Sequence, residues 1–440
     1  MSDAVNLAEM TERVWATVGE DELLHLTARM VDIPSPTGEE EALARDVVGY
    51  MTAEGLEARA QPVAPGQANA IGVRRGRGGG RDLLFYAPLD TAFAGRPDED
   101  EPWIDLAARP DQVAKAVIEG PVVRGLGAHN PKGHGACAVM AAVALARAGI
   151  ELPGDITVAL CAGGMPTDAR PGGAGGQNAG HGAGCTYLLE HGCTADAAIV
   201  AKPGGVSWEE VGVCWFRVTV RGLLGYAGTR HVMEHRNPIV DAATVIQELE
   251  QWFPEYARRN ASGLVSPQGS IGAVRAGWPN KPTFIPEVCE IDLDLRASPR
   301  TPPLEVRRQF AAAIEEIRGR HPDISVDWQM RLAVPGSHTE PGQPVIASAT
   351  RGWEFANART YSAGTGGSGA TEANVLRLWG LPTARVGMPP PPAPMRFSGR
   401  FSMGEAHNRS LGVLTRTLIF AALDFCLSEQ REGREMGGLS

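Results

Sequence analysis

Two histidines, His129 and His134, flank Lys132 within the glycine-rich segment Gly125–Gly135. An imidazole changes charge near neutral pH, so either histidine could act as a general acid or base, or bind a single divalent metal. A histidine on a glycine-rich loop is more commonly a solvated polar side chain. The spacing therefore offers a catalytic interpretation and a plain structural one, and both stay open.

The seven cysteines are dispersed and form no Cys-x-x-Cys pair. They are Cys137, Cys161, Cys185, Cys193, Cys214, Cys289 and Cys426. An odd, scattered set is typical of reduced, mostly buried thiols in a cytoplasmic protein, although one of them could be a nucleophile. The glycine-rich stretch Gly172–Gly184 has neither the Walker spacing nor a following Lys-Ser/Thr, so we expect a flap over a pocket rather than a phosphate loop.

Length and composition limit the number of domains, the class of protein and the kinds of partner. A chain of 440 residues predicts two domains, and 43% hydrophobic with 21% charged residues is typical of a globular protein. The net charge of -10 comes without a basic block, which argues against nucleic acid as a partner. The N-terminal segment has no apolar core of a signal peptide, and we expect no apolar run long enough to cross a membrane. These features predict a cytoplasmic protein with no membrane partner.

The elements that must position such residues alternate along the chain. Helical apolar spacing covers residues 7–32, 39–54 and 136–148. Ser35 or Thr37 could cap the second of these helices. Strand-like apolar runs cover residues 70–73, 83–87, 156–161 and 197–201. This alternation predicts an α/β sheet with helices on both faces.

A second pattern begins near Val211, where apolar and polar residues alternate. The expected order is strand, helix, strand, helix, strand, at residues 213–222, 238–253, 290–297, 304–319 and 325–332. We interpret this block as a small α+β domain inserted into a larger one. The predicted boundaries are 1–211 and 336–440 for the main domain and 212–335 for the insertion. An amphipathic helix at 410–427 ends the main domain.

Six segments, in order along nearly the whole chain, resemble motifs of the M20 family of two-zinc amidohydrolases and peptidases. They are Ile33–Glu40, Leu83–Thr91, Arg124–Gly133, Gly222–Gly228, Thr371–Ala373 and Phe401–Glu405. A single match would be weak, but the ordered set indicates the fold. The resemblance implies a zinc-peptidase-like α/β main domain with a mixed central sheet and an inserted α+β lid and dimerisation domain. It also implies a homodimer formed through that domain.

Members of this family hold two zinc ions with imidazoles and carboxylates, and a glutamate takes the proton from the bridging water. A lid histidine stabilises the developing oxyanion. By alignment, most of these positions carry other residues here: Pro88, Asn130, Gly164, Met165, Lys202, Phe401 and Tyr226. A lysine would place a cation where two zinc ions need anions. We therefore expect no zinc pair and no other cofactor, while a single displaced divalent metal stays open.

The residues at and around the replaced positions could form a different, rebuilt site. Lys202 could hold a substrate carboxylate or an oxyanion, or form a structural ion pair with Asp90 or Glu405. Tyr226 could donate a hydrogen bond where the lid histidine did, or simply fill the gap. We assign catalysis to Asp90, His129, Lys202, Tyr226 and Glu405. We assign substrate contacts to Asn130, Lys132, His235, Arg236, Asn237 and Glu372.

The sequence thus predicts a hydrolase that acts on an amide or amine C–N bond of a small, anionic molecule. Two other interpretations stay open. One is an inactive M20-like protein that binds a small ligand or a partner. The other is a non-hydrolytic enzyme, catalysing a cyclisation or an elimination, on the same fold.

Overall fold

The computed structural model describes residues 6–101, 103–170, 176 and 178–428, and the chain divides into two compact units. Unit 1 takes in residues 1–208, 339–363 and 371–440, and unit 2 takes in 209–338 and 364–370. We expected residues 364–370 in the main domain. They belong to unit 2 because the amide of Ser266 donates to the carbonyl of Gly367 (2.9 Å) and Val265 forms a β-bridge with Gly367.

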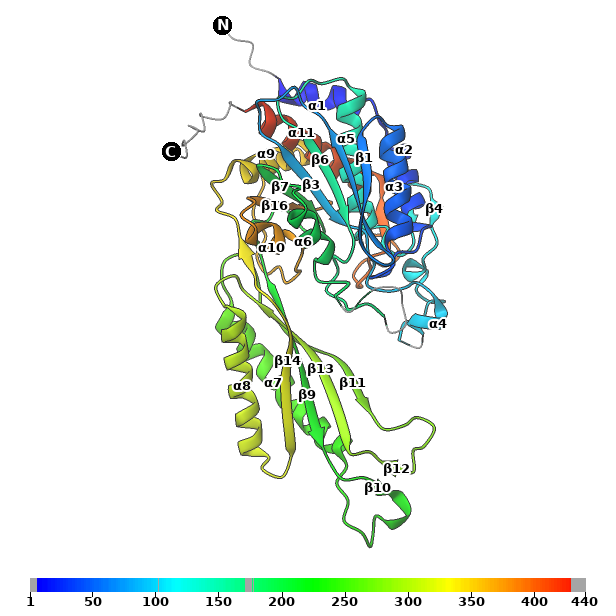
Figure 1. Ribbon diagram of the computed structural model, residues 1–440, viewed down its shortest axis with the longest axis vertical. Helices are drawn as coiled ribbons and strands as arrows, with labels where there is room; N and C mark the ends of the chain where they lie inside the picture. The colour runs from blue at the N-terminus through cyan, green and yellow to red at the C-terminus, as the bar shows by residue number, and fades with distance from the viewer. Residues whose placement is uncertain (1–5, 102, 171–175, 177, 429–440) are drawn as a thin grey trace. The chain divides into compact units, whose positions relative to one another are not determined.

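Unit 1 is built on a six-stranded mixed sheet (Figure 1). Its strand order is β1 (Glu57–Ala64), β2 (Gln67–Arg74), β6 (Ile156–Cys161), β3 (Leu83–Pro88), β7 (Ala197–Ala201) and β16 (Thr383–Val386). β6, β3, β7 and β16 run parallel, whereas β1 and β2 pair antiparallel with their neighbours. The carboxyl ends of the parallel strands therefore meet at one edge of the sheet, where such folds bind ligands.

Helices cover both faces of this sheet. One face packs on α1 (Leu7–Trp15), α2 (Glu20–Val31), α3 (Glu41–Ala53), α5 (Lys132–Arg147), α9 (Pro344–Asn357) and α11 (Asn408–Leu427). The other packs on α6 (Ala183–Glu190) and α10 (Ala373–Leu378). Successive residues of β3 confirm the layers, because Phe85 belongs to the first apolar core and Leu84 to the second.

Short elements complete unit 1. They are α4 (Pro97–Asp100), the 3-10 turn Pro110–Gln112, and a small sheet of β17 (Glu405–His407), β5 (Val122–Arg124) and β4 (Val117–Glu119). α11 is long and apolar enough to span a membrane, so our expectation that no run qualifies was wrong. However, 83% of its apolar window is buried inside the protein, which is typical of a core helix.

Unit 2 is a four-stranded antiparallel sheet with two helices on one face. The strand order is β11 (Gly269–Ala276), β13 (Val288–Ala297), β9 (Gly212–Arg221) and β14 (Ser325–Val334). The helices are α7 (Pro238–Asn260) and α8 (Pro303–Arg320). Shorter pieces are β8 (Glu209–Glu210), β10 (Gly225–Tyr226), the 3-10 turn Ala227–Thr229, β12 (Phe284–Ile285) and β15 (Ser337–His338).

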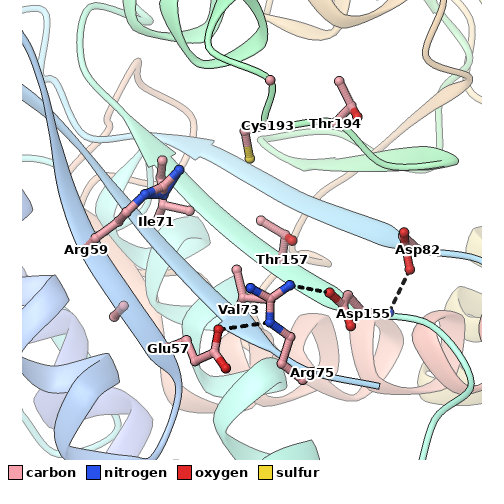
Figure 2. A pocket seen from close by; sticks show the side chains of 12 residues that line it. Glu57, Arg59, Ile71, Val73, Arg75, Asp82, Asp155, Thr157, Cys193 and Thr194 are labelled. Atoms are coloured by element: carbon pink, nitrogen blue, oxygen red, sulfur yellow. Dashed lines mark hydrogen bonds and ion pairs between the residues drawn. The ribbon is translucent and has the colours of Figure 1, made fainter. Parts of the chain in front are cut away.

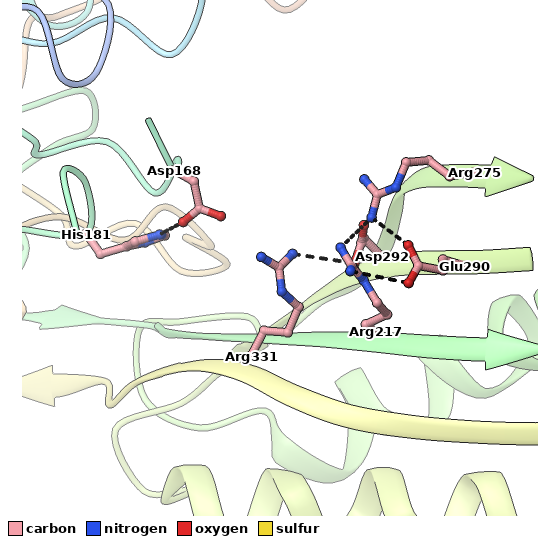
Figure 3. Close-up of polar contacts among 7 residues, drawn as sticks. All are labelled: Asp168, His181, Arg217, Arg275, Glu290, Asp292 and Arg331. Atoms are coloured by element: carbon pink, nitrogen blue, oxygen red, sulfur yellow. Dashed lines mark hydrogen bonds and ion pairs between the residues drawn. The ribbon is translucent and has the colours of Figure 1, made fainter. Parts of the chain in front are cut away.

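The two faces of the unit 2 sheet differ in chemistry. Alternate residues such as Phe216 and Ile291 point into an apolar core with α7 and α8. The intervening residues carry charge, and Arg217 bonds Asp292 at 2.8 Å while Arg275 and Arg331 also reach Asp292 (Figure 3). The period of two along each strand therefore separates a packed face from an ion-paired one.

Candidate active site

The candidate site lies where β3, β6 and β7 end. Asp90 follows β3, the loop Ala162–Met165 follows β6, and Lys202 follows β7 directly. These strands are parallel neighbours, so the chain segments that leave them meet at one edge of the sheet.

Asp90 is fully buried and holds this loop in place. Its Oδ1 accepts a hydrogen bond from the amide of Gly164 (2.7 Å), and its Oδ2 accepts from the amide of Met165 (2.9 Å) and from Oγ1 of Thr37 (2.7 Å). Burial raises the pKa of Asp90, and these donors together with the charge of Lys202 oppose the rise. All three donors are protein groups, so Asp90 positions the 163–165 loop and Thr37.

Glu40 is a second buried carboxyl group beside Asp90, and the sequence interpretation missed it. Its Oε1 accepts from the amides of Gly38 (3.0 Å) and Gly163 (2.9 Å). Burial, followed by the charge of Asp90, raises the pKa of Glu40 to about 8. Three consecutive amides, at 163, 164 and 165, thus donate to two carboxyl groups. The only sequence signal was membership of the segment that resembles the family.

The predicted capping role of Ser35 or Thr37 was wrong. The Thr37 hydroxyl bonds Asp90, and Oγ of Ser35 donates to the carbonyl of Leu89 at 2.8 Å. Helix α3 begins only at Glu41, and no side chain caps it. Both hydroxyls tie the N-terminal segment to the end of β3, which explains why they stand beside the site.

Lys202 is buried, with 4% of its surface exposed. Its Nζ donates to Sδ of Met165 at 3.7 Å. Among the described residues no carboxylate oxygen lies within 4.0 Å of it, so neither Asp90 nor Glu405 forms the structural ion pair that we considered. The ammonium is therefore held by a weak thioether acceptor, with Asp90 as a more distant opposite charge.

The loop before α5 brings the two histidines together. The rings of His129 and His134 meet edge to face, with centroids 5.1 Å apart. Nδ1 of His134 lies 2.6 Å from the carbonyl of His129, and Nε2 of His134 accepts from the amide of Met388 (3.3 Å). His134 is thus used structurally. Burial lowers the pKa of the partly buried His129 to about 4, so its ring is neutral at physiological pH.

Oδ1 of neighbouring Asn130 is buried and accepts no hydrogen bond from the described part of the chain.

Two predicted site residues make structural contacts instead. Nζ of Lys132 is fully buried and donates to the carbonyl of Ile33 (2.7 Å), so this amine is not presented to a substrate. Glu405 accepts from Nε of Arg124 (2.9 Å) and from the amide of Phe397 (2.9 Å). The ion pair with Arg124 links β17 to β5 across the small sheet.

Glu372 reaches the loop after β6. A Cβ atom on Gly164 would lie 2.0 Å from its Oε1 and 2.4 Å from Cβ of Pro88, so only glycine fits at 164. The charge of Glu372 adds to burial in raising the pKa of Tyr86 well above its usual range. The structure therefore brings Glu372, Asp90, Lys202 and the 163–165 loop together.

The other predicted residues lie in unit 2. Tyr226 is half-exposed on β10 and its ring lies 5.7 Å from that of Phe284. Nε2 of His235 accepts from Arg230 (3.0 Å), and Arg236 forms an ion pair with Asp241 (2.6 Å). Asn237 caps α7 by accepting from the amide of Ile239 (3.0 Å). Of the expected flap, residues 172–175 and 177 lie outside the described residues; His181 in its described part contacts Asp168 at 3.3 Å (Figure 3).

Comparisons with known proteins identify the architecture. Residues 209–322 match the M20 peptidase dimerisation domain. A curated relative, N-carbamoyl-L-amino-acid amidohydrolase of Pseudomonas sp. (strain NS671), is 33% identical over 114 residues, which is 26% of this chain and only 25% of the relative. Human carnosine dipeptidase 1 superposes with a TM-score of 0.71 at 14% identity, over 95% of this chain and 99% of that one. The predicted fold class, a main domain with a mixed sheet plus an inserted dimerisation domain, is confirmed.

The same comparisons correct the expectation of no cofactor. A dinuclear metal binding peptidase of the M20 family from Bacillus subtilis superposes with a TM-score of 0.60 at 14% identity, over 92% of this chain and 98% of that one. Solved structures of this fold therefore include metal-binding peptidases, so the fold gives no reason to expect a protein without a metal. The described residues contain no group of three or more His, Cys, Asp or Glu side chains placed to hold a metal. Because this donor set does not fit a metal pair, no step below passes through one.

Proposed function

We propose that this chain, whose residues 209–322 match the M20 peptidase dimerisation domain and whose fold is similar to that of human carnosine dipeptidase 1, hydrolyses a C–N bond of a small, anionic molecule. The substrate class that we favour is an N-carbamoyl or N-acyl amino acid. The curated relative is named for action on N-carbamoyl-L-amino acids, which combine such a bond with a carboxylate.

The observation that carries the proposal is the environment of Lys202. A buried ammonium without a close carboxylate is costly, because its hydration is lost and little replaces it. Nζ of Lys202 meets only Sδ of Met165 as a hydrogen-bond acceptor among the described residues. A substrate carboxylate beside Nζ would supply the missing charge, and that binding would leave the C–N bond near the ends of β3, β6 and β7.

We assign catalytic, binding and positioning roles to the remaining residues. The neutral imidazole of His129 takes a proton from the attacking water, and the leaving nitrogen is protonated as the C–N bond breaks. The amide of Asn130 binds the substrate. Asp90 and Glu40 position the 163–165 loop, and Glu405 positions Phe397. Glu372, which lies beside the 163–165 loop, is a proposed substrate contact. Tyr226, His235 and Arg236 lie in unit 2, and their substrate role stays a prediction from the resemblance.

Substitution of Lys202 tests the proposal. Purified protein is assayed on N-carbamoyl and N-acetyl amino acids and on their matching carboxamides, after chelation and with added Zn²⁺ or Mn²⁺, so that metal dependence is measured together with activity. The intact protein should prefer the carboxylates. Lys202→Met should raise KM for them by about 10- to 100-fold, the value of a hydrogen bond to a charged group, and abolish the preference.

Stability separates substrate binding from a structural role. Lys202→Met should leave the free energy of unfolding unchanged or higher, because it removes a buried charge without a close partner. Lys202→Arg keeps the charge and serves as the matched control, which should retain the preference for carboxylates. Absence of hydrolysis on the whole panel under every metal condition would contradict the proposed activity.

A further inference from the structure

A cavity of about 520 Å³ lies at the end of the central sheet opposite the candidate active site (Figure 2). Asp82 and Asp155 line it just before the amino ends of β3 and β6, whereas Asp90 and Lys202 follow the carboxyl ends of β3 and β7. The segment after α6 forms another wall with Cys193 and Thr194. Its volume falls within the range of about 300–1,000 Å³ that is common for small-molecule sites.

The acidic side chains of this cavity already have partners. Arg75 bonds Glu57 at 2.8 Å and Asp155 at 2.7 Å. Asp155 also accepts from the amide of Gly76 (2.8 Å), and Asp82 accepts from the amide of Asp155 (2.8 Å). These bonds join the acidic side chains with Arg75 along one side of the cavity.

Arg59 differs from the other charged side chains of this cavity, because it has no close hydrogen-bond or ion-pair partner in the described chain. It lies on β1 directly opposite Ile71 of β2, so both share the face of the sheet that forms the cavity. Among the described residues its guanidinium makes no hydrogen bond and no ion pair within 4.0 Å, although its charge acts on the thiol of Cys193. The hydroxyls of Thr157 and Thr194 line the same space and donate to no other residue of the described chain. Ile71 and Val73 add an apolar surface.

We propose that this cavity is a second ligand site, separate from the active site, which binds a small carboxylate with an apolar body. A planar carboxylate matches the fork of the Arg59 guanidinium and can accept from the threonine hydroxyls. The cavity also contains Glu57, Asp82 and Asp155, and this negative charge disfavours a dianion such as phosphate. The proposal does not depend on what the active site catalyses.

Cys193 provides a reporter inside the cavity. The other six cysteines are buried, and only Cys193 is partly accessible. Burial raises the pKa of its thiol, which Arg59 opposes, so alkylation is measured at mildly alkaline pH. The thiolate displaces iodide from iodoacetate or from neutral iodoacetamide, and mass spectrometry of the Cys193 peptide gives both rates. The ratio of the two rates reports how strongly the cavity attracts a carboxylate.

Arg59→Gln should lower the iodoacetate-to-iodoacetamide ratio by about two- to fivefold. The iodoacetamide rate alone should also fall, because Arg59 favours the thiolate of Cys193, but this fall affects both reagents and cancels in the ratio. Arg77→Gln is the matched control, because Arg77 is exposed nearby but does not line the cavity. Benzoate or hexanoate should slow iodoacetamide labelling of the intact protein and of Arg77→Gln but not of Arg59→Gln, and inorganic phosphate should protect less. An unchanged ratio in Arg59→Gln, or equal protection by phosphate, would overturn the proposal.

Discussion

At the scale of single residues, Lys132 is unusual because an amine is completely buried with a backbone carbonyl as its hydrogen-bond partner. Burial lowers its pKa to about 7, and the charge of Asp32 opposes that shift only partly. An unfolded lysine has a pKa of about 10.4. Between these two values the unfolded chain binds a proton that the folded chain does not. The contribution of Lys132 to the free energy of unfolding therefore rises with pH from about 7 to about 10. Below pH 7 the folded chain bears the full cost of burying the protonated amine.

Lys132→Met should reveal this dependence. At pH 6 the variant should be more stable by a few kcal/mol, because the buried charge is gone. At pH 10 it should be less stable by about 1 kcal/mol, because only the hydrogen bond to Ile33 is lost. Urea unfolding of both proteins at several pH values measures the difference.

Lys115 supplies the comparison for this experiment. Its side chain is 71% exposed and pairs with Asp32 at 2.9 Å. Lys115→Met should therefore change stability by less than about 1 kcal/mol and show no such rise between pH 7 and 10. If Lys132→Met gave the same stability difference at pH 6 and pH 10, Lys132 would have an ordinary pKa.

The sequence identified which residues surround the candidate site better than it identified their contacts. Asp90 and Lys202 do meet the loop after β6, because both follow strands that neighbour β6 or β3, and Glu372 reaches the same loop from the start of α10. The role of Glu40 could not be predicted, since the contact that ties it to the site is with the amide of Gly163, more than a hundred residues away. Nor could the sequence indicate that Glu405 pairs with Arg124, because that contact depends on the register of the small sheet.

At the scale of elements, two buried strands of the central sheet were predicted closely, and two edge strands were missed. β6 and β7 match their predicted bounds, because both faces are apolar. β1 and β11 are edge strands and are largely exposed, so their sequences lack a strong apolar pattern. Helix α7 continues past Phe253, where we ended it, and through Pro254, because Tyr256 also remains buried in the core of unit 2.

Asn237 tests whether a family-like residue serves the helix or the substrate. It caps α7, so Asn237→Ala should lower the free energy of unfolding by about 1 kcal/mol. Asn237→Asp keeps the cap and places negative charge at the helix N-terminus, so it should be close to neutral or stabilising. Urea unfolding measures both variants.

Kinetics of the same variants then decide the assignment. If Asn237 only caps the helix, Asn237→Asp should have the KM of the intact protein. A raised KM in Asn237→Asp at unchanged stability would instead support the substrate contact assigned from the resemblance. The two roles thus separate without relying on a destabilised variant.

At the scale of the whole molecule, unit 2 holds most of the large apolar side chains that are exposed in the described chain. Val240 on α7 is 63% exposed, and Val274 on β11 is 49% exposed. β11 is an edge strand, so it also has unpaired backbone groups along its outer side. An exposed apolar edge is a common surface for pairing with a second chain, and the match of residues 209–322 to a dimerisation domain points to the same unit.

We therefore expect a homodimer that uses β11 and the adjacent α7. Sedimentation at micromolar concentration should give twice the chain mass of 46.6 kDa. Val274→Arg should shift the protein toward monomer, because two arginines related by a two-fold axis would repel each other and lose apolar contact. Leu378→Arg is the control, since Leu378 is 60% exposed on α10 of unit 1 and should leave the dimer intact. A monomeric intact chain would refute the dimer, and a Val274→Arg protein that stays dimeric would move the interface away from β11.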